Sequence, residues 1–551
     1  MNGMRRTEAI FLFLICLFSA VIFASGCSGD SASERQPNDS IATSPPRVPD
    51  LNVLTYHNDN FRTGQYVGET SLTPANVNSA NFGKVGFLPM RGLVDAEPLY
   101  VSNLMVKGAR RKVIFVATEH DLVYAFDADT FAPLWRVSLL EAGETTSDNR
   151  GCEQVTPEIG ITATPVIDLS KGPHGAIYVV AMSKDSQGHY FQRLHALDLA
   201  TGAEVSGSPA AISATYSGRG AGSKNGRLSF DAKQYKERAA LSLANGLIYT
   251  TWSSHCDVSP YTSWVIAYNS ANLQQAGVLN LTPNGTEGAI WMTGAGPAVD
   301  EAGNVYLLTG NGSFDTTLNA EGFPAEGDYG NAFVKLAMKS GKLGVVDYFT
   351  MHDTVDQSEQ DEDLGSGGIA LLPDMQDVSG AVRHLAVGAG KDQIVYLVDR
   401  DSMGHFNASA DRVYEKDTWA IGGMEFGAPA YFGDAVYYGA YKDELRAFTF
   451  VNATLPRLPS SQTSQKFDYP GTTPSVSANG NLNGIVWTVE NSVPAVLHAY
   501  AASDLCKELF NSNQAGARDQ FENNKFITPM IADGRVYVGT KAGVAVFGLL
   551  K

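Results

Sequence analysis

TPMIADGRVYVGTKAGVAVFGL, at residues 528–549, decides the fold of this chain. It begins with small residues and then contains an apolar strand, a turn, a VYVGT strand, a second turn and a VAVFGL strand. Seven further stretches repeat the pattern, and they begin at Glu97, Thr164, Ala240, Gly296, Gly368, Gly427 and Thr473. Units of roughly 40–60 residues with three or four short alternating strands are typical of propeller blades. The sequence therefore predicts an all-β fold, an eight-bladed β-propeller.

The last unit is one strand short. With the strands lettered A to D from the axis outward, it contains A, B and C and then ends at Leu549. The segment KVGFLPM, at residues 84–90, has the pattern of a D strand but precedes the first unit. We predict that this N-terminal strand completes the last blade and closes the ring, because closure removes open sheet edges. Residues 51–551 would then form one propeller domain.

The first 50 residues have a different composition. Arg5 and Arg6 precede an apolar run over residues 9–24, which is typical of a secretory signal. Ala24-Ser25-Gly26-Cys27 resembles a bacterial lipobox, with an ordinary signal peptide as the alternative. We expect a signal peptide over 1–26, lipidation at Cys27 and a Ser/Pro-rich tether over 27–50. The expected location is extracytoplasmic, on the outer membrane facing the periplasm or on the cell surface.

Charge and cysteine usage narrow the functional classes. The formal net charge of −18 argues against nucleic acid as a partner, because phosphate binding needs a basic surface. Cys152 and Cys256 lie in loops that should emerge on the same face of adjacent blades, so we predict a disulfide between them. We expect Cys506 to be a buried lone thiol. The cysteine spacing fits no zinc site, and we predict no metal site.

The longest loops all belong to one face, where the B–C and D–A connections of a propeller emerge. Long loops gathered on a rigid scaffold usually carry function, with neutral insertion as the alternative. We interpret the acidic run over residues 356–363 as a solvated loop. No catalytic residue can be assigned, because no hydrolase, zinc-protease or phosphate-loop motif is present. The candidate ligand-binding residues are Glu119, Asp121, Glu158, Arg238, His255, Asp257, Trp291, Asn311 and Lys391.

For three of these candidates the sequence predicts a more specific environment. Trp291 would suit the floor of a site for a flat cofactor or a sugar, or it would pack between blades. Glu158 and Arg238 both precede A strands and are expected to point inward as a charge pair.

The turns YAFDADTFAPLW, HALDLATGAEV and YLVDRDSMG resemble the quinoprotein alcohol dehydrogenase-like propellers, also called pyrroloquinoline-quinone (PQQ)-like repeats. The stretches TYHNDNFRTGQ, CEQVTPEIGITATPV and SHCDVSPYTSWVIAY are similar to a subgroup of secreted bacterial proteins. The resemblance implies a quinone under a ring of two adjacent cysteines, calcium bound by Glu, Asn and Asp, and an Asp base. This chain has neither an adjacent cysteine pair nor a C-x-x-C-H haem motif. We therefore expect no tightly bound quinone.

Three functional readings remain at this point. The first is a lipid-anchored propeller whose long-loop face forms a funnel that binds a small molecule, a glycan or a protein segment. The first alternative is a PQQ-type dehydrogenase that acts on an alcohol or a sugar with calcium. The second alternative is a polysaccharide-acting surface enzyme.

Overall fold

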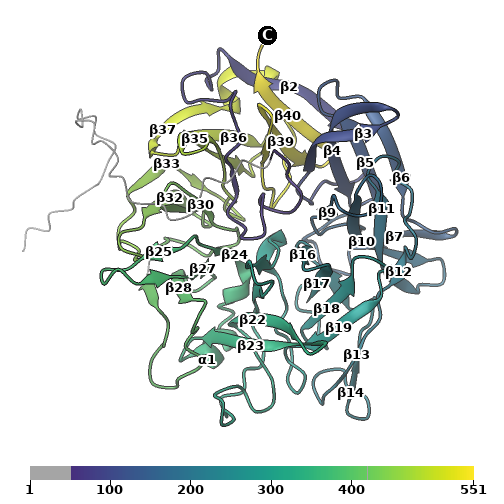
Figure 1. Ribbon diagram of the computed structural model, residues 1–551, viewed down its shortest axis with the longest axis vertical. Helices are drawn as coiled ribbons and strands as arrows, with labels where there is room; N and C mark the ends of the chain where they lie inside the picture. Colours follow the sequence, from purple (N-terminus) through teal and green to yellow (C-terminus); the bar gives the residue numbers. More distant parts are fainter. Residues whose placement is uncertain (1–50, 419) are drawn as a thin grey trace, which may run out of the picture. The chain divides into compact units, whose positions relative to one another are not determined.

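The computed structural model describes residues 51–418 and 420–551, which belong to one compact unit over Val48–Lys551. Eight sheets follow one another around a central axis in this unit (Figure 1). The prediction of an eight-bladed β-propeller is thus confirmed. The predicted signal peptide, Cys27 and the predicted tether lie outside the described residues.

The first four blades are antiparallel sheets of consecutive strands. Blade 1 contains β3 (Leu99–Val106), β4 (Ala109–Thr118), β5 (Leu122–Asp127) and β6 (Pro133–Ser138). Blade 2 contains β9 (Val166–Asp168), β10 (Ala176–Asp185), β11 (Tyr190–Asp198) and β12 (Ala210–Ala211), with β7 (Glu144–Asp148) and β8 (Glu158–Ile159) added. Blade 3 contains β16 (Ser242–Ala244), β17 (Leu247–Ser254), β18 (Trp264–Asn269) and β19 (Gln275–Asn280). Blade 4 contains β20 (Ala298–Val299), β21 (Val305–Leu308), β22 (Ala332–Lys339) and β23 (Lys342–Thr350).

The other four blades continue the pattern. Blade 5 contains β24 (Ile369–Leu371), β27 (Leu385–Ala389), β28 (Ile394–Asp399) and β29 (Glu415–Thr418). Blade 6 contains β30 (Ala430–Phe432), β31 (Ala435–Tyr438), β32 (Asp443–Thr449) and β33 (Ser461–Phe467). Blade 7 contains β34 (Ser475–Asn479), β35 (Leu482–Glu490), β36 (Val496–Ala501) and β37 (Asp504–Asn511). Blade 8 contains β38 (Met530–Ala532), β39 (Arg535–Thr540), β40 (Gly543–Leu549) and β2 (Phe82–Pro89).

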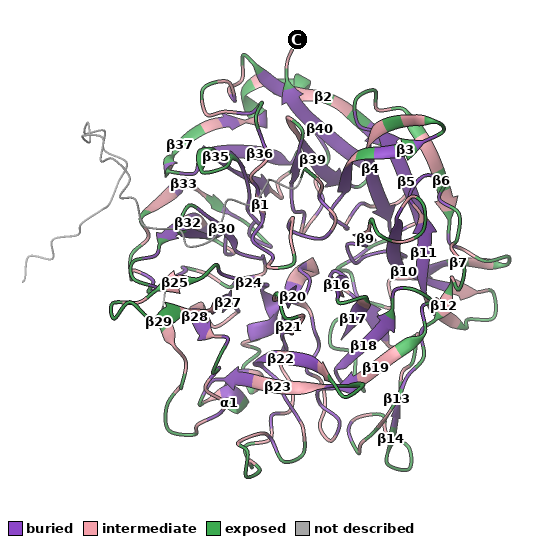
Figure 2. Ribbon diagram, in the orientation of Figure 1, coloured by how far each residue is buried: buried purple, intermediate pink, exposed green. Residues whose placement is uncertain are grey.

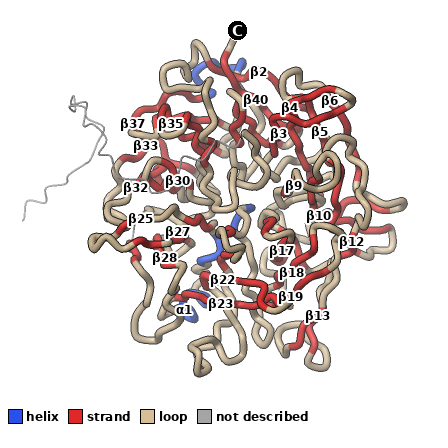
Figure 3. Tube along the Cα trace, viewed as in Figure 1, coloured by secondary structure: helices blue, strands red, loops and turns tan. Residues whose placement is uncertain are grey.

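The innermost strand of each blade begins one to three residues after the start of its repeat, for example β38 at Met530 after Thr528. These strands are short, and the middle strands of the blades are almost wholly buried (Figure 2). Helix is confined to short segments in the connections, α1 (Thr354–Glu359), η1 (Met292–Gly294), η2 (Leu364–Ser366) and η3 (Ser512–Arg518) (Figure 3). Among the described residues, no helix has the length and apolar character that crossing a bilayer requires.

Blade 8 is built from both ends of the propeller sequence. β2 pairs with β40 in antiparallel order, from Phe82 opposite Leu549 to Pro89 opposite Gly543. It therefore occupies the outer position for which the sequence predicted residues 84–90. Phe82 also packs against Trp487 of blade 7 and Phe547 of blade 8, with ring centroids 5.3 and 6.4 Å apart. The N-terminal strand thus contributes aromatic surface as well as backbone hydrogen bonds.

A second N-terminal element, which we call the axial segment (residues 53–69), contacts the inner part of every blade. Its backbone groups bond to blades 1, 2, 4, 5, 6 and 7, through Tyr100, Ile167, Val299, Leu371, Tyr431 and Val476. Its side chains reach the other two blades: Asn60 donates to the Leu243 carbonyl of blade 3, and Tyr56 bonds to Thr528 at the start of blade 8. Because one short segment satisfies backbone groups around the whole ring, it joins blades that do not touch one another.

Arg62 lies at the centre of the axial segment and is fully buried. Its guanidinium donates to Thr55 Oγ1 at 2.6 Å and Ser242 Oγ at 2.6 Å, and to the Pro297 carbonyl at 3.1 Å. Burial lowers the pKa of Arg62 to about 10, so it stays charged at neutral pH. Its charge is therefore solvated by protein hydroxyl and carbonyl groups in place of water.

Candidate functional site

A cavity of about 330 Å³ opens among the D–A and B–C loops, on the face where the long loops were predicted to carry function. Its lining combines cationic, aromatic and hydroxyl side chains with a disulfide. We call it the funnel. The funnel is lined by Cys152, Gln154, Val155, Ile159, Lys236, Arg238, Ser253, Ser254, His255, Cys256, Asp257, Trp291, Thr293, Asp363, Ser366, Lys391, Phe426, Tyr469 and Phe526.

One wall of the funnel carries two cations without a carboxylate partner. Lys236 lies on β15 (Tyr235–Glu237), which pairs with β17 and places Lys236 opposite Ser253. Arg238 follows two residues later, and its guanidinium lies 4.7 Å from the centroid of the Phe526 ring. Within the described part of the chain, neither side chain has a carboxylate oxygen within 4.0 Å or a hydrogen-bond partner. Two unpaired cations in a chain of net charge −18 make the funnel attractive to anions.

His255 lies at the end of β17, next to these cations, and is 3% exposed. Neither ring nitrogen makes a well-formed hydrogen bond. Burial, together with the charges of Lys236 and Arg150, lowers the pKa of His255 to about 3. The imidazole is therefore neutral at physiological pH, and it offers the funnel one donor and one acceptor.

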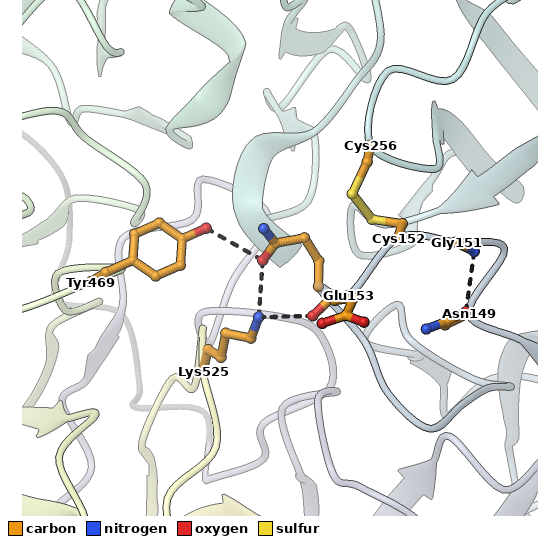
Figure 4. The surroundings of a disulfide bond; sticks show 8 residues. Asn149, Gly151, Cys152, Glu153, Cys256, Tyr469 and Lys525 are labelled. Carbon is orange, nitrogen blue, oxygen red and sulfur yellow. Dashed lines mark hydrogen bonds between the residues drawn. A yellow bond between two sulfur atoms is a disulfide. The ribbon is translucent and has the colours of Figure 1, made fainter.

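A strap (residues 149–158) crosses the funnel from blade 2. Cys152 and Cys256, the predicted pair, form a disulfide with their Cα atoms 5.4 Å apart, which fixes the strap to blade 3. Further along the strap, Gln154 Oε1 accepts from Tyr469 Oη at 3.4 Å and from Lys525 Nζ at 3.0 Å (Figure 4). Tyr469 precedes blade 7 and Lys525 precedes blade 8. The strap is thus held on both sides of the funnel.

The funnel also has an aromatic cluster, and one of its rings, Phe526, contacts Arg238. Tyr469 packs edge-on against Phe426 and Phe526, with centroids 5.5 and 5.8 Å apart. Trp291, at the start of η1, lines the same cavity and also packs against the core of blade 3. Trp291 was expected either to line a ligand site or to pack between blades, and each expectation therefore describes part of its environment. Aromatic and cationic side chains in one cavity suit a ligand that is planar and negatively charged.

A buried ion pair lies beside Trp291. Asp363 Oδ2 lies 2.6 Å from Lys391 Nζ, and Asp363 Oδ1 accepts from the Asn311 backbone N–H at 2.6 Å. Burial raises the pKa of Asp363 to about 6, despite the opposing charge of Lys391. A β-carbon at Gly310 would lie 2.5 Å from Asp363 Oδ1 and 2.8 Å from Trp291 Cδ1, so only glycine lets both side chains approach here.

Three solved structures are similar to this chain over most of its length. They are the quinohemoprotein alcohol dehydrogenase from Comamonas testosteroni (TM-score 0.59, 14% identity, 91% of this chain and 80% of that chain), the quinohemoprotein alcohol dehydrogenase ADHIIG from Pseudomonas putida HK5 (0.55, 13%, 91% and 80%) and a europium-containing methanol dehydrogenase (0.56, 12%, 90% and 98%). The chain has the fold of the quinoprotein alcohol dehydrogenases. No protein-family model and no curated protein matches its sequence. At these identities the likeness is one of fold.

Five of the predicted site residues line the funnel: Arg238, His255, Asp257, Trp291 and Lys391. Asp257 is exposed at the rim, where Oδ1 accepts from Tyr261 Oη at 2.5 Å. The five come from three different blades and the loops before them, as convergence of loops at a propeller axis requires.

Four predicted site residues do not line the funnel. Glu119 and Asp121 are buried between blades 1 and 2, where Glu119 Oε2 accepts from the Gly160 N–H at 2.8 Å and Asp121 turns inward at a φ of 50°. Asn311 lies outside the lining, with Nδ2 donating to Asp361 at 2.9 Å. The predicted charge pair between Glu158 and Arg238 is wrong, because Glu158 Oε2 instead lies 2.8 Å from His120 Nδ1.

Two other expectations are also corrected. Asp363 belongs to the run interpreted as a solvated loop, but its side chain is only 7% exposed, because it directly precedes η2 and pairs with Lys391 in the lining of the funnel. Cys506 is exposed on β37 rather than buried, and it is not a free thiol.

Two funnel residues that the sequence did not predict, Phe426 and Phe526, share their place in the repeat with the predicted residue Arg238. Each of the three lies four residues before the first residue of an innermost strand, which begins at Ala430, Met530 and Ser242 respectively. Aligning the D–A loops on the start of the A strand would have found this position. Lys236, Tyr469 and Asp363 also precede A strands, but at other spacings.

One group outside the funnel has the side chains of a metal site. His352, Asp353 and Asp411 place one ligand atom each within 4.8 Å of one another. Asp411 is already engaged by His352 Nδ1 at 2.8 Å and by Lys416 Nζ at 2.5 Å. The group is therefore satisfied by its own protein contacts.

Proposed function

We propose that this protein binds a planar, negatively charged small molecule in the funnel. The observation that carries the proposal is that Lys236 and Arg238, two cations without carboxylate partners in the described part of the chain, line one cavity with Phe426, Tyr469 and Phe526. A carboxylate is the group that two desolvated cations recognise best. The aromatic side chains would cover the flat body of the ligand. A small molecule fits the cavity volume better than a folded protein segment or a long glycan.

The test compares two planar probes that differ only in charge, naphthalene-2-carboxylate and naphthalene-2-carboxamide. Isothermal titration should show the carboxylate binding at least about tenfold more tightly, because charge-assisted hydrogen bonds contribute about 1.5–3 kcal/mol. Arg238→Gln should remove most of this preference. Arg110→Gln, at an exposed arginine on β4 whose Nη1 bonds to Asn103, should retain it. Equal affinities for the two probes, or no binding of either, would contradict the proposal.

A quinone-dependent dehydrogenase is the second candidate, and Asp363 is the observation that favours it. A carboxyl with a pKa of about 6, held by Lys391 beside Trp291, suits a base that takes a proton from a substrate hydroxyl. A disulfide also lines the funnel, although its cysteines are 104 residues apart rather than adjacent. A bound quinone would supply the two-electron acceptor for such a reaction.

The funnel residues fit a quinone carboxylate better than they fit calcium. Lys236 and Arg238 offer cations for the acidic groups of PQQ, and Trp291 offers a ring face. In contrast, the Asp363 oxygens are occupied by the Asn311 N–H and by Lys391 Nζ. Within the described residues, the group of His352, Asp353 and Asp411 is the one arranged for a metal, and it lies outside the funnel. Calcium therefore does not fit the funnel in this arrangement.

The dehydrogenase candidate is tested by adding PQQ, with and without calcium, and measuring alcohol oxidation with a dye acceptor. Asp363→Asn should abolish turnover, while PQQ, followed by its absorbance, should remain bound to the protein. Arg238→Gln should weaken PQQ binding itself. No turnover by PQQ-loaded wild-type protein on alcohols or sugars would reject this candidate and leave the binding function standing.

We also propose that the protein works outside the cytoplasm, anchored by lipid at Cys27. The Cys152–Cys256 disulfide supports an oxidising compartment, since cytoplasmic thiols are kept reduced. Mass spectrometry of the mature protein should find an acylated cysteine at its N-terminus. A mature chain that begins elsewhere, without lipid, would contradict the anchor.

A further inference from the structure

Lys236 differs from the other lysine of the funnel. Its side chain is 7% exposed and lines the cavity together with Ser253, Ser254 and His255. In the described part of the chain, no carboxylate oxygen lies within 4.0 Å of its Nζ. Lys391 lines the same cavity but is paired with both Asp361 and Asp363 at 2.6 Å. Of the two lysines that line the funnel, Lys391 is thus neutralised by carboxylates and Lys236 is not.

Four charged groups, in addition to burial, affect the pKa of Lys236. Burial opposes its protonated form most strongly, and Arg238 and Lys525 add repulsion. Glu119 and Asp95 act in the opposite sense from blade 1, but they do not compensate, so the pKa of Lys236 falls to about 8. At pH 7 the neutral fraction of such an amine is on the order of 100-fold larger than for an ordinary lysine. A neutral amine is the nucleophilic form.

We propose that Lys236 is a nucleophile that condenses with the carbonyl carbon of an aromatic aldehyde or ketone held in the funnel. The proposal rests on the proposed binding function, and it adds a carbonyl to the chemistry of the ligand. Arg238, the residue directly after β15, lines the same cavity as Lys236 and would bind the ligand's carboxylate. Glu237, between them, is buried and does not line the cavity. Both cations are therefore available to one ligand.

The reaction is a condensation without a redox partner. The Nζ lone pair attacks the carbonyl carbon, a C–N bond forms, and the oxygen becomes the hydroxyl of a carbinolamine. Loss of that hydroxyl breaks the C–O bond, and the oxygen leaves as water with the two hydrogens of the amine. His255 lines the cavity beside Lys236 and is neutral, so it can orient the carbonyl or the carbinolamine hydroxyl by a hydrogen bond, while water carries the protons. The product is a reversible imine.

The experiment uses 4-formylbenzoate, which carries a carbonyl and a carboxylate on a flat ring. Native protein is incubated with the probe at pH 7, reduced with cyanoborohydride and digested for mass spectrometry. We expect the reduced adduct at Lys236 at least about tenfold more abundantly than at Lys391, and adduct formation should rise with pH through about 8. Lys236→Met should lose the adduct, while Lys541→Met, at an exposed lysine, should keep it.

The outcomes separate this proposal from the binding function. If 4-formylbenzoate binds, competes with naphthalene-2-carboxylate and leaves no adduct at Lys236, the nucleophile is rejected and the binding function stands. If neither probe binds, the binding function fails as well. An adduct spread evenly over surface lysines would also reject the proposal. Mapping on the native protein gives the answer even if Lys236→Met does not fold.

Discussion

Three buried glutamates lower the stability of the folded protein by an amount that depends on pH. Burial raises the pKa of Glu97, Glu119 and Glu425 to about 8 in each case. Glu425 is the simplest of them, because Oε1 accepts from the Gly427 N–H at 2.6 Å while Oε2 has no partner. A protonated carboxyl would be tolerated at that position far better than a carboxylate. The propeller is therefore built to hold acids in their neutral form.

This arrangement predicts that the protein loses stability as the pH rises from about 5 to 8. Over that range the folded protein retains protons that the unfolded chain releases near pH 4.5, so the free energy of unfolding falls. Each such carboxyl contributes a slope of at most about 1.4 kcal/mol per pH unit. Glu425→Gln keeps an oxygen for Gly427 and should make the slope shallower. Urea unfolding at several pH values measures it, and a slope that is unchanged in the variant would contradict the assignment.

At the scale of single elements, we expect the strap to control access to the funnel, because it lines the cavity and is attached on both sides of it. The double variant Cys152→Ser/Cys256→Ser would free one end of the strap while Gln154 still holds the other. We expect a loss of roughly 2–5 kcal/mol in stability. We also expect both association and dissociation of naphthalene-2-carboxylate to accelerate by a similar factor, since the strap is a barrier to passage more than a ligand contact. Stopped-flow fluorescence provides the rates.

Gln154→Ala is the matched comparison, because it removes the side-chain contacts to Tyr469 and Lys525 and keeps the disulfide, leaving the bond from Lys525 Nζ to the Glu153 carbonyl. It should accelerate ligand exchange with little loss of stability. Exchange rates that match those of the wild type in both variants would show that the strap does not gate the funnel.

The sequence predicted the elements better than it predicted the site. The strand pattern repeats with each blade, so the eight units, their innermost strands and the disulfide pair could be read from spacing alone. Site residues depend on which way a side chain points after an irregular loop, and spacing does not determine this. Glu119 and Asp363 illustrate it: Glu119 follows β4 yet turns inward to Gly160, whereas Asp363 ends an acidic run yet lies buried under the funnel.

At the scale of the whole molecule, Arg62 joins parts of the ring that are distant in the sequence. Arg62→Met would leave the Pro297 carbonyl and the hydroxyls of Thr55 and Ser242 without this donor. We expect a loss of about 2–4 kcal/mol in the free energy of unfolding. Arg110→Met, on the exposed part of β4, should change it by less than about 0.5 kcal/mol. Denaturant titration compares the two, and a stability equal to that of the wild type for Arg62→Met would refute the structural role.

The axial segment also determines when, during translation, the ring of blades can be completed. Translation produces residues 53–69 first, yet their hydrogen-bond partners extend to Val476, and Tyr56 bonds to Thr528. β2 likewise waits for β40, which is translated more than 450 residues later. Early blades can fold as they emerge, but the axial segment around which they are arranged stays unsatisfied until blades 7 and 8 have been made. A nascent chain stalled in blade 7 would therefore expose an unsatisfied axial segment and an unpaired N-terminal strand, the two features by which a quality-control protease would distinguish it from the finished protein.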